Sequence, residues 1–111
     1  MAPLTANPNA PDKRGRTPIF EAARRGYTEI VKILAPLTSN PNAPNNNGST
    51  PIHEAAYHGH AEILKILVPL ADNPNAQNKY GNNPICKATE RGNFEIANII
   101  INILKSFERQ T

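Results

Sequence analysis

The chain has 111 residues, of which 39% are apolar and 19% charged, enough for one buried core and too few residues for a second domain. It holds no apolar run that could span a membrane, no secretory signal, and a single cysteine, which excludes an internal disulfide. A net charge of +3 falls short of a dedicated nucleic-acid binder. An intracellular protein, cytoplasmic or nuclear, is therefore expected.

The sequence repeats with a period of 33 residues. The landmarks are glycines, prolines that follow Thr or Asn, and Asn-Pro-Asn-Ala segments: Gly15, Gly48 and Gly81, Pro18, Pro51 and Pro84, and residues 7–10, 40–43 and 73–76. Such a period predicts a solenoid, because one short unit cannot bury its apolar face alone and must stack on the next.

Each unit begins with a turn and a short first helix. Thr or Asn followed by Pro is a typical helix start, and a single glycine stops each helix. The predicted first helices cover residues 18–25, 51–58 and 84–91.

A second helix follows in each unit, indicated by apolar residues at helical spacing within 30–34, 63–67 and 96–104. Because proline cannot donate a hydrogen bond to the preceding turn, Pro36 and Pro69 should end or distort the first two of these helices near Ala35 and Val68. The third has no such proline and should run on to Phe107.

Residues 48–56 (Gly-Ser-Thr-Pro-Ile-His-Glu-Ala-Ala) and 59–67 (Gly-His-Ala-Glu-Ile-Leu-Lys-Ile-Leu) resemble the ankyrin repeat. The resemblance implies an all-α solenoid of antiparallel helix pairs joined by extended β-turn loops. It divides a single domain, 1–111, into the remnant of a preceding repeat and three repeats, the last ending in a C-terminal cap: residues 1–11, 12–44, 45–77 and 78–111.

No residue cluster predicts catalysis, a cofactor or a metal site. The resemblance gives His53 and His60 structural hydrogen bonds between turn and helix, which leaves His58 free for a partner. Cys86 is expected to be a buried, inert thiol facing the stack. The six glutamates at repeated helix positions are expected to lie in solvent and pair with nearby Lys or Arg: Glu21, Glu29, Glu54, Glu62, Glu90 and Glu95.

The ankyrin geometry places the turn tips and the exposed ends of the first helices on one concave face. The expected function is a non-enzymatic protein-interaction module, and the basic first repeat favours an acidic patch on the partner. No small-molecule substrate, membrane or nucleic acid is expected. The predicted contact residues are Lys13, Arg14, Arg16, Glu21, Arg24, Arg25, Asn46, Asn47, Ser49, Glu54, Tyr57, His58, Lys79, Tyr80, Asn82, Lys87, Glu90 and Arg91.

Two alternatives stay open. Independently of them, stacks can associate end to end through Leu4 at an uncovered edge. One alternative is an engineered or truncated ankyrin scaffold that has no native ligand. The other makes the chain a substrate, because Asn42 and Asn75 occupy the place that an asparaginyl hydroxylase modifies in many ankyrin repeats.

Overall fold

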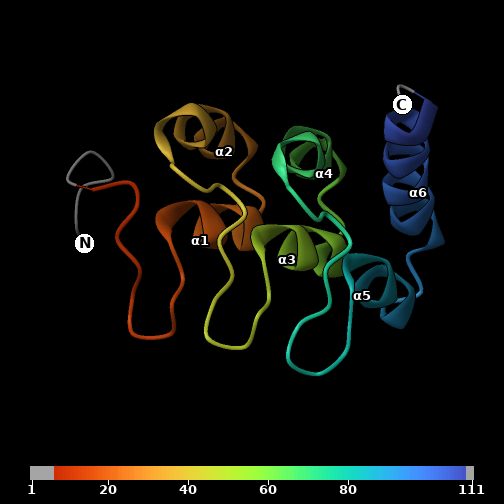
Figure 1. Cartoon of the computed structure of the whole chain (residues 1–111), viewed down its shortest axis with the longest axis horizontal. Helices are drawn as coiled ribbons and strands as arrows, with labels where there is room; N and C mark the ends of the chain where they lie inside the picture. Colours follow the sequence, from red (N-terminus) through yellow and green to blue (C-terminus); the bar gives the residue numbers. More distant parts are fainter. Residues whose placement is uncertain (1–6, 110–111) are drawn as a thin grey trace.

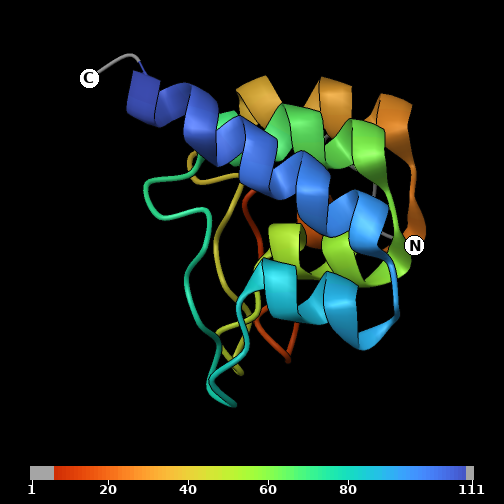
Figure 2. The ribbon, with the colours of Figure 1, turned by 90° about the vertical axis from the view of Figure 1, so that its right-hand side faces the viewer.

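In the computed structural model, which describes residues 7–109 and the side chains of 7–106, three helix pairs form two parallel rows (Figure 1). The first row consists of α1 (Pro18–Arg25), α3 (Pro51–His58) and α5 (Pro84–Glu90). The second row consists of α2 (Thr28–Leu34), α4 (Ala61–Leu67) and α6 (Phe94–Arg109). A hairpin loop precedes each first-row helix, and the three hairpins extend beyond that row on the side away from the second row (Figures 1 and 2).

Local capping chemistry sets the bounds of the first-row helices. The side chains of Thr17, Thr50 and Asn83 each accept a hydrogen bond from the backbone N–H three residues later, at 3.3, 3.3 and 2.8 Å. Gly26 and Gly59 end α1 and α3 in the left-handed conformation. The predicted bounds are confirmed for these two helices, and α5 ends one residue early, at Glu90.

The prolines shorten α2 and α4 as predicted. Each is followed by one 3₁₀ turn containing the proline, Ala35–Leu37 after α2 and Val68–Leu70 after α4. Helix α6 has no internal proline and continues for 16 residues. It passes the predicted end by two residues.

The core lies between the two rows and between neighbouring pairs. Ala23 and Ala56 are fully buried, and such small side chains allow the first-row helices to approach closely. Ile63, Leu64 and Leu67 of α4 are also fully buried, because α4 has helix pairs on both sides. The repeat boundaries assigned from the period remain a prediction.

The expectation of a buried thiol is wrong: Cys86 is exposed. The residues one and two periods earlier, His53 and Phe20, are 0% and 1% exposed. Each of these has a following helix pair to cover it, whereas α5 belongs to the last pair in the described chain. Leu4, the residue expected at an uncovered edge, lies outside the described residues.

Candidate interaction face

The hairpin–helix face consists of the three hairpin tips, residues 12–16, 45–49 and 78–82, together with α1, α3 and α5. Each tip is closed by one side chain at its first position. A side-chain oxygen of Asp12, Asn45 or Asn78 accepts hydrogen bonds from the backbone N–H groups two and four residues later, at 2.9–3.1 Å. Hydrogen bonds, first of all from the backbone of Arg16, lower the pKa of Asp12. These are Asx turns, which fix the tip conformation locally.

Neighbouring tips are joined through their backbones. The N–H of Asn46 donates to the carbonyl of Arg14 at 2.9 Å, and the N–H of Lys79 donates to the carbonyl of Asn47 at 2.8 Å. The side chain of Asn46 also donates to the carbonyl of Lys13 at 3.1 Å. The predicted contact residues at the tips are therefore held at fixed spacing by backbone contacts.

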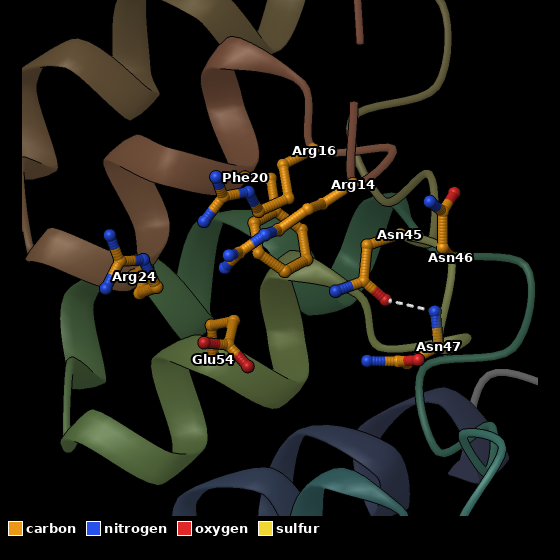
Figure 3. Close-up of a pocket in the computed structure, with 8 residues that line it drawn as sticks. All are labelled: Arg14, Arg16, Phe20, Arg24, Asn45, Asn46, Asn47 and Glu54. Carbon is orange, nitrogen blue, oxygen red and sulfur yellow. Dashed lines mark hydrogen bonds between the residues drawn. The ribbon is translucent and has the colours of Figure 1, made fainter. Parts of the chain in front are cut away.

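A cavity of about 530 Å³ lies on this face between the first two helix pairs. Figure 3 shows Arg14, Arg16 and Arg24 around Phe20, with Glu54 below them and the second hairpin tip beside them. Phe20 is almost fully buried and forms the floor. The complete lining is Arg14, Arg16, Phe20, Arg24, Asn45, Asn46, Asn47 and Glu54.

One carboxylate organises most of the arginines beside this cavity. Glu21 forms ion pairs with Arg24 at 2.9 Å, Arg16 at 3.1 Å and Arg25 at 3.5 Å. The hydrogen bond with Arg24 lowers the pKa of Glu21 and raises that of Arg24. Arg14 is exposed and makes no ion pair with any described residue. Among the arginines that line this cavity, its guanidinium group is therefore the one most available to a ligand.

Glu54 departs from the expected pattern of solvated, locally paired acids. Glu21, Glu29, Glu62 and Glu90 each pair with a Lys or Arg three residues away. Glu95 is exposed as expected, but it makes no ion pair with any described residue. The carboxylate of Glu54 is half-buried and has no hydrogen bond or ion pair with any described residue. Burial raises its pKa, against the attraction of Arg24 and Lys87.

A second cluster surrounds Tyr57 on α3. The guanidinium carbon of Arg91 lies 4.7 Å from the centre of the Tyr57 ring, and the ammonium of Lys87 lies 4.9 Å from it. The ring of His58 packs edge-on against Tyr57 at 5.0 Å. These are cation–π distances, so the ring holds two cations of the third repeat in place on the face.

The histidine assignments agree with the structure. Nε2 of His53 lies 2.9 Å from the carbonyl oxygen of Asn82, and Nε2 of His60 lies 3.2 Å from that of Arg24, so both rings join neighbouring repeats. His58 is exposed, although partial burial still lowers its pKa. Within the described residues, no group of three or more His, Cys, Asp or Glu could hold a metal ion. No described helix is long and apolar enough to cross a membrane.

Ser49 does not fit the predicted contact surface. It is buried, and its hydroxyl oxygen accepts a hydrogen bond from the side chain of Asn78 at 3.2 Å. Sequence reasoning also missed Phe20 and Asn45 as cavity residues. The signal for Asn45 was present, since it stands one period after Asp12 and one before Asn78.

The two asparagines singled out for modification lie in the loops after α2 and α4 and do not line the cavity described above. Asn42 is buried, and its side-chain N–H donates to the carbonyl oxygen of Leu67 at 3.1 Å. The Oδ1 atoms of Asn42 and Asn75 are buried and have no hydrogen-bond partner among the described residues.

A stack of helix pairs that presents its turns and one helix row on a common face defines an α-helical repeat protein. The family model of ankyrin repeats (3 copies) matches residues 2–78 and 37–110. The chain therefore belongs to the ankyrin-repeat family. Ankyrin repeats are generally protein–protein interaction modules and the family is typically non-enzymatic. A search of curated proteins found no significant match to this sequence.

Proposed function

We propose that this chain is a non-enzymatic protein-interaction module that binds a partner through the hairpin–helix face, which is concave in the ankyrin geometry. The observation that carries the proposal is the way this face is preorganised. Its tips are joined by backbone hydrogen bonds, and its central cations are held by Glu21 and Tyr57. Preorganised side chains lose little conformational entropy when a partner binds.

The partner that best fits this face presents an acidic patch. Arg14, Arg16 and Arg24 line one cavity, and Lys87 and Arg91 flank Tyr57 beside it. Tyrosine and arginine are also the residues most often found to dominate binding energy at interfaces. The proposed contact surface retains all the predicted residues except the buried Ser49.

The test is affinity capture from a lysate of the source organism, followed by binding measurements with the purified candidate. One variant changes the face: Arg24→Glu, Tyr57→Ala and Tyr80→Ala. A matched control makes one charge reversal and two truncations of exposed side chains on α2 and on the 3₁₀ turn after α4: Lys32→Glu, Ile33→Ala and Leu70→Ala. Both must give the parent's circular dichroism spectrum.

A partner retained by the parent and the control but lost by the face variant supports the proposal. A partner retained equally by all three shows that another surface binds it. If nothing is retained, the alternative of a repeat scaffold with no native ligand gains support.

Hydroxylation of Asn42 and Asn75 is a second proposal with weaker support. The two residues stand one period apart in equivalent loops, but Asn42 is buried and donates to Leu67, so its loop must open before an enzyme reaches it. Mass spectrometry after treatment with an asparaginyl hydroxylase tests this proposal. A mass gain of one oxygen at these residues supports it, and an unchanged mass refutes it.

A further inference from the structure

Glu54 occupies an unusual position in the cavity between the first two helix pairs. The residue one period earlier, Glu21, has three arginine partners, and the residue one period later is Lys87. Glu54 alone among these three positions carries a negative charge that no described residue neutralises by direct contact. It faces the same cavity as Arg14, whose guanidinium is also without an ion-pair partner there.

Any segment that fills this cavity removes water from Glu54. A half-buried carboxylate that loses its remaining water without gaining a hydrogen bond is costly. The charges of Arg24, Lys87 and Arg16 already act on Glu54 through space, so a further cation would be repelled by these neighbours. The group best suited to Glu54 is therefore a neutral N–H or O–H donor.

The side of the cavity formed by Arg14 and Arg16 is best suited to an anion. Asp12 and Glu21 already bind the guanidinium of Arg16, whereas that of Arg14 is free among the described residues. A carboxylate can accept two parallel hydrogen bonds from one guanidinium. A phosphate dianion would bring a second negative charge close to Glu54, which disfavours it.

Resting on the function proposed above, we propose that this cavity is a two-part subsite for an extended acidic segment of the partner protein. Arg14 binds a carboxylate side chain of that segment. Glu54 accepts a hydrogen bond from a neutral donor of the same segment, such as a backbone N–H or a serine hydroxyl. Arg14 supplies affinity for the acid, and Glu54 discriminates against ligands that cover the cavity without a donor.

The first experiment is an NMR titration of the ¹⁵N-labelled full chain with a synthetic peptide in which glutamate alternates with serine. The expected result is saturable shifts of the backbone amides of Arg14, Asn47 and Glu54, and none at Lys32 or Lys65 on the second row. The control peptide replaces each glutamate with glutamine and should cause no shift. No shifts, or equal shifts on both rows, would overturn the subsite.

Two pairs of substitutions separate the subsite from general charge attraction. Arg14→Gln should raise the Kd of the glutamate–serine peptide about fivefold, as expected when a charge-assisted hydrogen bond is lost. Lys105→Gln removes the same charge from an exposed side chain on α6, which neither lines the cavity nor belongs to the proposed contact surface, and should change the Kd by less than about twofold. Equal losses in the two variants would overturn the role of Arg14.

The sign of the change in peptide affinity caused by Glu54→Gln tests the proposed role of Glu54. General attraction predicts tighter binding of an acidic peptide once a negative charge is removed, and this is the outcome expected for Glu90→Gln. The subsite predicts weaker binding for Glu54→Gln, because a charged acceptor is lost. Tighter or unchanged binding would overturn the role of Glu54. The Arg14 and Lys105 variants alter only exposed side chains, so their comparison tests the role of Arg14 even if Glu54→Gln fails to fold.

A third peptide, with phosphoserine in place of glutamate, distinguishes the source of the anion. Weaker binding than the glutamate peptide supports the carboxylate assignment, and tighter binding refutes it. Failure of the subsite differs visibly from failure of the proposed function. A captured partner that depends on Tyr57 and Tyr80 but not on Arg14 or Glu54 would uphold the interaction face and refute the subsite.

Discussion

His53 joins the second repeat to the third through the backbone of Asn82. Its Nδ1 atom accepts a hydrogen bond from the N–H of Thr50 at 3.0 Å, and its Nε2 atom lies 2.9 Å from the carbonyl oxygen of Asn82. Assigned from this network, the ring is neutral and carries its proton on Nε2. The side chain is fully buried, so a second proton would have to displace the bond to Thr50.

Stability should therefore decrease as the pH falls below the ordinary histidine pKa. Burial lowers the pKa of His53 in the folded chain, so the unfolded chain binds this proton at a higher pH. The stabilisation is complete above about pH 6.5 and declines toward the lowered pKa of the folded state. Urea unfolding at about pH 7.5 and about pH 5.5 should show this loss in the parent. In His53→Gln the difference should be smaller, with a remainder from His58, whose pKa burial also lowers. If His53→Gln loses as much stability between the two pH values as the parent, other groups cause the pH dependence.

Gly26 should tolerate alanine less well than Gly92. Both have a positive φ, at 80° and 71°, so an added Cβ costs about 1–2 kcal/mol at either position. At Gly92 nothing lies within 4 Å of the new atom, whereas at Gly26 it would lie 2.6 Å from Cε1 of His60. The ring must then move and lose its bond to Arg24, which adds about 1 kcal/mol. Denaturant unfolding measures the free energy of unfolding of both variants. Equal decreases would show that His60 moves without an energetic cost.

Asn78→Ala should destabilise the fold by about 2 kcal/mol. It removes one buried hydrogen-bond donor and one oxygen that accepts two hydrogen bonds. The Asn78 side chain donates to Ser49 and accepts from the N–H groups of Tyr80 and Asn82. Asn47→Ala is the control: this side chain is exposed, and the change should stay within about 0.5 kcal/mol. Similar losses in thermal unfolding would contradict the role assigned to Asn78.

Cys86 should react with a thiol reagent in the folded protein without denaturant. Its exposure at the uncovered side of α5 leaves no need for unfolding. The control is Ala56→Cys in a Cys86→Ser background, since Ala56 is fully buried and its thiol should react only when the chain opens. Native-state reaction rates measure both, and a protected Cys86 would indicate that another surface covers this end.

Reversing Arg24 and Arg25 to glutamate should slow association with an acidic partner and weaken its dependence on salt. Both arginines lie at the end of α1, where Arg24 lines the cavity, and charge complementarity acts chiefly on the association rate. Stopped-flow or biosensor kinetics at low and high salt measure the effect. Unchanged association rates would remove this end of α1 from the contact surface.

The first-row helices could be predicted from sequence because their determinants are local. Thr17 and Thr50 cap the N-termini, and Gly26 and Gly59 stop the helices one turn after the last buried residue. The early ends of α2 and α4 were predictable for the same reason, since a proline acts on its own turn.

The exposure of Cys86 and the isolation of Glu54 were missed for different reasons. The exposure of Cys86 depends on whether a further helix pair covers α5, and no residue near Cys86 in the sequence indicates this. For Glu54 the evidence was in the sequence: Arg24 and Arg25 follow Glu21 by three and four residues, whereas Tyr57 and His58 follow Glu54 at the same distances. Local pairing was therefore available to Glu21 and impossible for Glu54.

The hydrogen bonds between hairpin tips have a consequence for how this face can change. Every one of the backbone bonds runs the same way, from an amide of the later tip to a carbonyl of the earlier one, at Asn46 to Arg14 and at Lys79 to Asn47. They are made by backbone atoms alone, although the side chains of Asp12, Asn45 and Asn78 still close the tips that carry them. The spacing between the tips is therefore set by the main chain. New side chains at Arg14, Asn47 or Lys79, which close no turn, would alter what is bound without altering where it is held.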